Sequence, residues 1–536
     1  MNNVTINRGQ GGLGRQPLGQ DFVSGMIFYP TSTTLAITHC PITNGQKAKL
    51  GGISDAIALG IAPNHFGETK AKITLTITAV GDVGDIMQVK YVDCQGNVTI
   101  LCNYTLTSGD VTDNTGDTLA TDLAAAINAQ SGLTGFTASP STNTVAIIVM
   151  AGQGIFSNAG TPLTAAVTNN AGSPFAYSHS VTTPGVASQL DAFYYHINRF
   201  FIQSPNSTLY VLFSESPSSW TGYGFAEVTT LFNYSTGAIR QIGVYQDSNV
   251  ATAPTMANLK GNVEAIQEQV AAIITADNFG VSVLLGATLI NPTGSLLAAA
   301  LTDLSICNSE HVSVVAGQDG GAQGNYLYNA YGISITQLGD VLGLVSRAQV
   351  SDDIAWVATY TLSPDGVENA VPALASGELL SNLSSGTINS VDAYRFIFGR
   401  QFVNDSPNGT FVNDSHCATA YTSDYAYIEN NRTFDKAARQ LYSAYVAQLA
   451  APLVLNSDGT LTNSTVAFFE GLGEQALSNM SQTNPNTGRP ELSGFSVTIN
   501  PAQNVLSTST LVVSVSLQPV GVAREIVINL QFAVTV

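Results

Sequence analysis

The 536-residue chain is poor in charge, because Asp, Glu, Lys and Arg make up only 10% of its residues, against roughly 25% in an average soluble protein. Apolar residues, at 44%, lie in the usual globular range. Interspersed surface charge normally keeps copies of a monomer apart, so this chain is expected to have much of its surface covered by other subunits. An assembly protein and a secreted, neutral polar adhesin both fit this composition.

Positive charge is especially scarce, with 18 Lys and Arg against 37 Asp and Glu and a formal net charge of −19. Nucleic-acid binding needs clustered Lys and Arg. No basic run occurs, so a nucleic-acid partner is excluded. The acidic residues are dispersed along the chain, which indicates a solvated acidic exterior.

Cysteine is also sparse and scattered. The five cysteines are Cys40, Cys94, Cys102, Cys307 and Cys417. An odd number without CxxC spacing indicates neither a disulfide framework nor a zinc site, and it fits a reducing compartment. Cys94 and Cys102 could face each other across a hairpin, but buried free thiols are the preferred interpretation.

Long apolar runs are absent, because none approaches the 18 residues that span a bilayer. The first residues, Met1–Thr5, lack the basic and apolar regions of a signal peptide. We therefore expect no direct membrane insertion and no export by a cleaved signal.

Motifs for catalysis are missing as well. The six histidines form no HxH or HExxH pair, and no GxSxG occurs. His416 and Cys417 are adjacent, but neighbours on a strand do not face each other. Asp352-Asp353 is interpreted as a polar turn before a buried strand rather than a catalytic carboxylate pair. We predict that the protein is not an enzyme and uses no cofactor or metal.

Three motifs are similar to known ligand-binding motifs, but the surrounding sequence argues against ligand binding in each case. Gly9–Gly14 matches GxGxxG, but no helix can open after it, so a flexible arm is favoured. Gly317–Gly324 follows a predicted strand but lacks GK[ST], which favours a loop at a subunit contact. Phe402–Ser406 and Phe411–Ser415 are near repeats around a turn, and they predict a hairpin rather than a calcium loop because EF-hand spacing is absent.

The composition along the chain predicts an α/β fold, α+β overall, with an open mixed α/β core, a strand-rich insertion and extended terminal arms. The expected parts are an N-terminal arm (1–25), the first part of the core (26–69), an outer insertion domain (70–185), the main core (186–518) and a C-terminal strand arm (519–536).

Within the core, helices and strands alternate, which indicates a mostly parallel sheet. The expected helices are Ser188–Phe201, Phe225–Tyr234, Met256–Ala276 and Thr433–Leu449, the last with Thr433 as its cap. The expected strands are Leu209–Phe213, Ile239–Tyr245, Val281–Leu285 and His311–Val315. The insertion combines strands Ile73–Val80, Ile86–Val92 and Val98–Tyr104 with one helix, Thr118–Asn128.

The C-terminal segment is the most regular of all. Strands are expected at Phe495–Ile499, Leu511–Gln518 and Arg524–Val536, and the last is apolar and ends without a polar tail. An unguarded apolar strand is an aggregation hazard unless something pairs with it, and its natural partner is another subunit's sheet edge. The candidate inter-subunit residues are Val4, Thr5, Ile6, Asn7 and Arg8 in the N-terminal arm, and Ile526, Val527, Ile528, Asn529, Leu530, Gln531 and Phe532 in the C-terminal arm.

Residues 190–536, taken in order, resemble the family of contractile tail sheath proteins from bacteriophages and related injection machines. Gly339–Arg347 with Ile354-Ala355-Trp356 is similar to the family's helix and "W" strand. Tyr427–Asp435 resembles the sheath "R-T-x-D" helix. Phe495–Pro501, with the closing hairpin Leu511–Phe532, resembles the family's C-terminal strands.

The resemblance implies a structural subunit that polymerises with copies of itself as stacked hexameric rings around an inner tail tube protein. Its arms would add strands to adjacent subunits, and contraction would be a rigid-body rearrangement. Baseplate and tail terminator proteins would be further partners, in a virion tail or contractile injection particle assembled in the bacterial host cytoplasm. The alternatives are another assembly protein, such as a tube, baseplate or capsid subunit, or a glycan-binding adhesin. The adhesin is disfavoured because Trp220 and Trp356 both lie outside the insertion.

Overall fold

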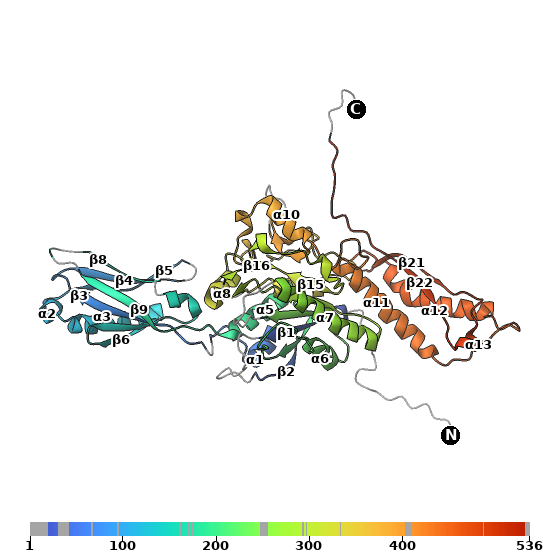
Figure 1. Cartoon of the computed structure of the whole chain (residues 1–536), viewed down its shortest axis with the longest axis horizontal. Helices are drawn as coiled ribbons and strands as arrows, with labels where there is room; N and C mark the ends of the chain where they lie inside the picture. Colours follow the sequence, from blue (N-terminus) through green and yellow to red (C-terminus); the bar gives the residue numbers. More distant parts are fainter. Residues whose placement is uncertain are drawn as a thin grey trace, which may run out of the picture.

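The computed structural model describes residues 20–29, 42–65, 68–93, 96–159, 162–168, 172, 175–246, 256–291, 294–295, 297–332, 334–402, 409–485 and 487–530. Figure 1 shows an elongated molecule in which an insertion domain, a central α/β core and a helix-rich C-terminal unit follow one another along the long axis. The predicted α/β fold class is confirmed.

A seven-stranded sheet forms the centre of the molecule. All of its strand pairs are parallel except the one that β2 makes with β10. In spatial order the strands are β18 (Phe396–Ile397), β15 (Val312–Val315), β12 (Ser282–Gly286), β11 (Gln241–Gln246), β1 (Val23–Tyr29), β10 (Thr208–Phe213) and β2 (Gln46–Leu50).

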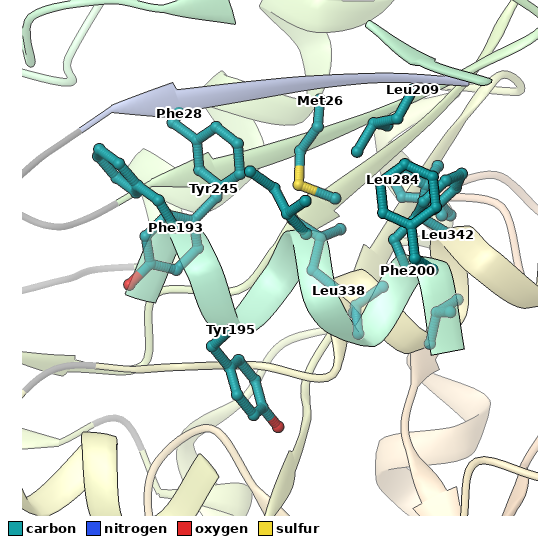
Figure 2. Packing of buried hydrophobic residues seen from close by; sticks show 14 of the residues in the cluster. Met26, Phe28, Phe193, Tyr195, Phe200, Leu209, Tyr245, Leu284, Leu338 and Leu342 are labelled. Carbon is teal, nitrogen blue, oxygen red and sulfur yellow. The ribbon is translucent and has the colours of Figure 1, made fainter. Parts of the chain in front are cut away.

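Helices cover both faces of this sheet. On one face, α5 (Gln189–Gln203) and α9 (Leu338–Arg347) pack on β1, and Figure 2 shows Met26 and Phe28 directed toward the α5 side chains. On the other face lie α6 (Glu227–Tyr234) and α7 (Met256–Asp277). The expected apolar stripe of α7 is buried, as its helical spacing predicts. It consists of Leu259, Val263, Ile266, Val270 and Ile273.

Two glycines let α9 approach α5 closely. A Cβ on Gly339 would lie 2.4 Å from the carbonyl oxygen of His196, and one on Gly343 would lie 2.6 Å from the Cβ of Gln203. Both helices are therefore held against each other and against the same sheet face. The predicted helix over Gly339–Arg347 is confirmed by α9.

The strand β1 was not expected, and it lies near the middle of the sheet between β10 and β11. It begins at Val23, so residues 23–25 of the expected N-terminal arm belong to the core. Gly25 leaves room for the side chain of Leu231, whose Cδ2 atom would lie 2.9 Å from a Cβ at this position. The remainder of β1 is fully buried.

The insertion folds around its own apolar core. Two antiparallel sheets, ordered β6-β7-β3-β9 and β5-β4-β8, pack with the helix α3 (Asp117–Ala129). The strands are β3 (Lys72–Ala79), β4 (Ile86–Val92), β5 (Val98–Thr105), β6 (Thr137–Ser141), β7 (Thr144–Ile148), β8 (Leu163–Thr168) and β9 (Ala176–Thr183). Two short helices, α2 (Ser108–Asp113) and α4 (Ser131–Thr134), complete it.

The insertion joins the core through two chain segments that pair at the bridge Thr69↔Val186. Beside it, the Nδ1 atom of His65 lies 2.6 Å from the Asp191 carboxylate at the start of α5. Glu68 accepts a hydrogen bond from the backbone N–H of Gly152, in the insertion, at 2.7 Å. The junction is therefore held by polar contacts from both sides.

This junction is expected to loosen as the pH rises from 6 to 9. The hydrogen bond to Asp191 raises the pKa of His65. The contribution of this pair to the stability of the junction is therefore complete below the ordinary histidine pKa, and it is lost as the pH rises through the pKa of His65 in the folded chain. Partly exposed ion pairs contribute about 0.2–1 kcal/mol, which is a change of up to about fivefold in an opening equilibrium. Amide exchange of Thr69 and Val186 measures it, and His65→Gln should remove the pH dependence. Equal pH dependence in both chains would contradict the assignment.

Shorter elements complete the core. They are α1 (Ile53–Ala58), β13 (Ile290–Asn291), β14 (Gly294–Ser295), β16 (Gly317–Asp319), α8 (Gln323–Tyr331), β17 (Pro372–Leu374), α10 (Ser385–Ala393), β19 (Gly399–Arg400) and β20 (Phe411–Val412). In the described part of the predicted hairpin, β20 pairs with β19. Residues 403–408 of that prediction lie outside the described residues.

The C-terminal unit is built from α11 (Ile428–Tyr445), α12 (Asn463–Ser481), the antiparallel pair β21 (Leu492–Thr498) and β22 (Ser514–Pro519), and the short helix α13 (Val505–Thr508). Its apolar side chains form two small clusters of their own. None of the helices that the structure describes has the length and apolar character of a membrane span.

Two predictions about local structure in this half were wrong. The helix α11 begins at Ile428 and not at Thr433, which is buried in its second turn and caps nothing. Ile354-Ala355-Trp356 forms turns and not a strand, because Asp353 accepts a hydrogen bond from the N–H of Ala355 at 2.8 Å and bends the chain.

Candidate assembly arm and its anchor

After β22 the chain passes back to the start of α11, where Arg524 contacts Glu429, and residues 525–530 then run away from the body of the molecule (Figure 1). These described residues form no strand, in contrast to the predicted strand Arg524–Val536. No strand of the described residues pairs with them. Three apolar side chains are almost fully exposed, with Ile526 at 77%, Ile528 at 81% and Leu530 at 93%.

The other candidate arm residues are placed as follows. Val527 is also exposed, at 71%, and Asn529 lies between Ile528 and Leu530 in the same exposed segment. Gln531 and Phe532 lie outside the described residues, as do all five N-terminal candidates, Val4, Thr5, Ile6, Asn7 and Arg8. A role in subunit contact stays a prediction for all of them.

Arg524 ties the base of this segment to the body. Its guanidinium lies 3.0 Å from Asp414 and 3.2 Å from Asp353, and it donates a short hydrogen bond to Glu429. Its central carbon also stands 3.5 Å from the centre of the Tyr427 ring, a cation–π contact. We call these five residues the Arg524 clamp.

One positive charge in the clamp is shared by three carboxylates. Burial disfavours the charged guanidinium, but attraction from Glu429, Asp414 and Asp353 outweighs it and raises the pKa of Arg524. Each carboxylate has only a share of that cation. Burial, with repulsion from Glu429 and Asp414, therefore raises the pKa of Asp353 to about 8. Burial likewise raises the pKa of Glu429, which is 3% exposed.

The clamp predicts that stability falls as the pH rises from 5 to 8. The pKa of Asp353 is higher in the folded than in the unfolded chain. Its contribution to the free energy of unfolding is therefore complete below pH 4 and is lost as the pH rises through about 8. The decline is at most about 1.4 kcal/mol per pH unit. In urea unfolding, the free energy of unfolding of Asp353→Asn should rise relative to that of the unmodified chain as the pH approaches 8. A difference between the two chains that does not change with pH would contradict this assignment.

A second arginine holds the neighbouring aspartate. Arg489 lies 2.7 Å from Asp352 and 4.3 Å from the centre of the Trp356 ring. Asp352 also accepts a hydrogen bond from Tyr360 at 2.6 Å. The prediction that Asp352-Asp353 precedes a buried strand is wrong, because Ile354-Ala355-Trp356 forms turns. The two aspartates receive arginines from the C-terminal region, one from before β21 and one from the exposed segment.

The base of the N-terminal region is held by the same helix as the Arg524 clamp. Asp21, just before β1, lies 2.8 Å from Lys436 and 3.0 Å from Arg439 on α11. Burial would raise the pKa of Asp21, but the two cations outweigh it and hold that pKa below its ordinary value. Lys436 also lies 2.7 Å from Glu491, next to β21. α11 thus holds the chain at both ends of the fold.

The β21–β22 pair has open edges. No other strand of the described residues joins this two-stranded sheet. The side chains of β22 alternate between exposed and half-buried, and the half-buried Val515 and Leu517 pack against the apolar cluster that includes Leu477 and Met480 of α12. Exposed strand edges are templates for pairing with another chain.

The glycine cluster Gly317–Gly324 holds its backbone N–H groups inside the chain. Asp319 accepts from Ala322 at 2.6 Å, and Glu368 accepts from Gly324 at 2.8 Å and from the Tyr195 hydroxyl at 2.6 Å. Burial, with repulsion from Asp319, raises the pKa of Glu368 to about 7. These donors are not available to a phosphate ligand. Gly9–Gly14 lies outside the described residues.

The adjacent pair His416-Cys417 does not form a catalytic dyad. Cys417 is a buried free thiol beside Ser313, and burial raises its pKa to about 12. His416 instead faces Asp392 at 3.2 Å. Cys102 and Cys307 are also buried free thiols, while Cys40 and Cys94 lie outside the described residues. Across the part of the chain that the structure describes, no three His, Cys, Asp or Glu residues are grouped to hold a metal ion.

The comparisons with known proteins are as follows. No curated protein matches the chain. One solved structure that it resembles is a chain of the cryo-EM structure of the anti-feeding prophage (AFP) baseplate, 6-fold symmetrised, with 13% sequence identity and a TM-score of 0.40 over 63% of this chain and 80% of that chain. The family model described as DUF2586, N-terminal domain, matches residues 1–416, and that described as DUF2586, C-terminal domain, matches residues 424–536. The chain belongs to the DUF2586 family.

Proposed function

We propose that this protein is a non-catalytic structural subunit of a contractile injection particle, and specifically a subunit of its tail sheath. The observation that carries the proposal is the apolar C-terminal segment, which leaves the fold uncovered while its base is held by the Arg524 clamp. An apolar strand exposed in this way is an aggregation hazard in an isolated molecule. When another copy of the chain covers it, the same strand forms a contact between subunits.

Strand addition to another subunit explains why the apolar segment is exposed and why its base is held by the Arg524 clamp. A segment that pairs with another subunit gains affinity from backbone hydrogen bonds and specificity from alternate side chains. Ile526, Ile528 and Leu530 are such alternate residues. Each molecule would both give a segment and receive one. A contact of this kind between unlike surfaces generates rings or helical tubes instead of closed dimers.

The Arg524 clamp is suited to a segment that transmits force between subunits. A subunit that moves as a rigid body during contraction pulls on its neighbours through whatever joins them. The clamp links the segment to Glu429 on α11 and to Asp353 and Asp414 in the core. A pull on the segment would thus reach the whole body.

The sparse charge of the chain and the order of its sheath-like motifs also favour this proposal. Under it, the subunits form stacked hexameric rings around an inner tail tube protein, and baseplate and tail terminator proteins cap the ends. The particle is a virion tail or a related injection machine, assembled in the bacterial host cytoplasm.

Electron microscopy of the purified full-length chain tests this proposal. A sheath subunit is expected to form wide hollow tubes, in an extended and a shortened form. Single rings or narrow tubes of one length would instead indicate a baseplate or tail tube subunit. Monodisperse single molecules at all concentrations would contradict an assembly role.

A further inference from the structure

The far end of the C-terminal unit carries an apolar groove of about 720 Å³. Its floor is formed by Tyr445 of α11 and Phe469 of α12, whose rings are stacked at 6.4 Å, and the Tyr445 hydroxyl donates to the Phe469 carbonyl oxygen at 2.8 Å. Residues that follow α11 and residues around α13 make the walls. The groove is therefore a built feature of three packed segments.

The lining of this groove has no charged side chain. On its rim, Leu449 is 76% and Leu506 is 74% exposed. Large apolar side chains that cluster around a concave surface mark a site of interaction. An occupant that matches this groove is apolar and uncharged.

The exposed C-terminal segment has that chemistry. Ile526–Leu530 contains four large apolar side chains and one asparagine, and no charge. Within the described residues nothing covers it, and the groove is likewise empty of protein. The same molecule thus presents an uncovered apolar segment and an uncovered apolar groove.

Geometry separates the two within one molecule. The clamp holds Arg524 at Glu429, in the first turn of α11, whereas Tyr445 ends that helix about 24 Å away at 1.5 Å per residue. From Arg524 to Ile528, the middle of the segment, an extended chain spans about 14 Å. Figure 1 also shows the residues after Arg524 leaving the body near the start of α11, far from α13. The segment of the same molecule does not fill this groove.

We propose that the groove lined by Tyr445, Phe469, Leu449 and Leu506 receives the C-terminal segment Ile526–Leu530 of a second copy of this chain. This inference rests on the proposed function and adds to it the surface that receives the arm. The contact is head-to-tail, because groove and segment lie on different parts of the subunit, so it propagates from copy to copy.

Two complementary chains test the assignment. The first is shortened by residues 525–536, so that it keeps the groove and Arg524 but supplies no segment. The second carries Leu449→Glu and Leu506→Glu, which place charge on the groove rim and leave the segment intact. Each chain alone is expected to stay monomeric in analytical ultracentrifugation. Mixed in equal amounts, they should form one-to-one dimers that do not grow.

Leu133→Glu is the matched control, since Leu133 is also highly exposed but lies in the insertion domain. That chain should polymerise as the unmodified one does, and thermal unfolding checks that every variant folds. Normal polymers from the groove-rim double variant would overturn the groove assignment and leave the proposed function standing. Normal polymers from the shortened chain would overturn the proposed role of the arm itself. A mixture that stays monomeric while the unmodified chain polymerises would also overturn the assignment.

Discussion

A chain shortened by residues 525–536 is expected to remain a folded monomer and to form no tubes. The shortened chain retains Arg524 and therefore the clamp, and residues 525–530, the part of the removed segment that the structure describes, are all exposed. Burying three large apolar side chains contributes about 5–9 kcal/mol in total. Their loss weakens assembly by on the order of a thousandfold or more. Sedimentation and electron microscopy measure this loss.

The alternation of side chains gives a control for this first prediction. In a paired strand, Ile526, Ile528 and Leu530 share one face and Val527 lies on the other. Polar substitution of the three to Asn should prevent assembly as fully as the deletion does. Val527→Thr should preserve it. Equal effects from both changes would mean that the segment does not pair as a strand.

Arg524→Ala is expected to destabilise the fold and to free the arm from its base. Removing one partner of a buried ion pair costs about 3–5 kcal/mol, because the remaining charge stays buried without a partner. Here Glu429, which is 3% exposed, would lose the cation beside it. Urea unfolding measures the loss of stability. Limited proteolysis measures the release of the segment.

Arg489→Ala is the matched control for Arg524→Ala, since Arg489 pairs with the adjacent aspartate, Asp352, but carries no arm. Arg489 pairs with one carboxylate and not three, and Asp352 keeps its hydrogen bond from Tyr360, so a loss of about 1 kcal/mol with unchanged assembly is expected. Arg524→Lys should recover only part of the stability, because an ammonium cannot bridge three carboxylates as a planar guanidinium does. If Arg524→Ala assembled and unfolded like Arg489→Ala, the clamp would have no special role.

The alternating helices and strands of the core could be predicted because their apolar periodicities are strong. The helix α7 shows five buried residues at helical spacing, and β10, β12 and β15 are short apolar runs between helices. The strand β1 was missed because it is buried along almost its whole length and shows no alternation. Its glycine, Gly25, also weakens the strand pattern, although the side chain of Leu231 packs closely against it.

The start of α11 could not be found from capping residues. Its N-cap is Tyr427, which makes no side-chain cap hydrogen bond, whereas the cap-like Thr433-Phe434-Asp435 lies inside the helix. Asp435 accepts a hydrogen bond from the N–H of Gly280 at 2.9 Å instead. The capping pattern thus predicted a helix start at Thr433, although Asp435 makes a tertiary hydrogen bond there and caps no helix.

The arm could be predicted from the sequence, but its anchor could not. The apolar alternation at Ile526, Ile528 and Leu530 is a local signal. Arg524 meets Asp414 and Glu429 across 110 and 95 residues of chain, and no local pattern encodes such a meeting. The one available signal was an isolated arginine before an apolar run in a chain with few cations.

A cryo-EM reconstruction of the assembled full-length protein tests the central claim most directly. We expect density for residues 526–530 of each subunit to lie against another copy of the chain, while Arg524 remains at Asp353, Asp414 and Glu429 of its own subunit. Density that folds these residues back onto their own subunit, or leaves them exposed in the assembled particle, would contradict the account.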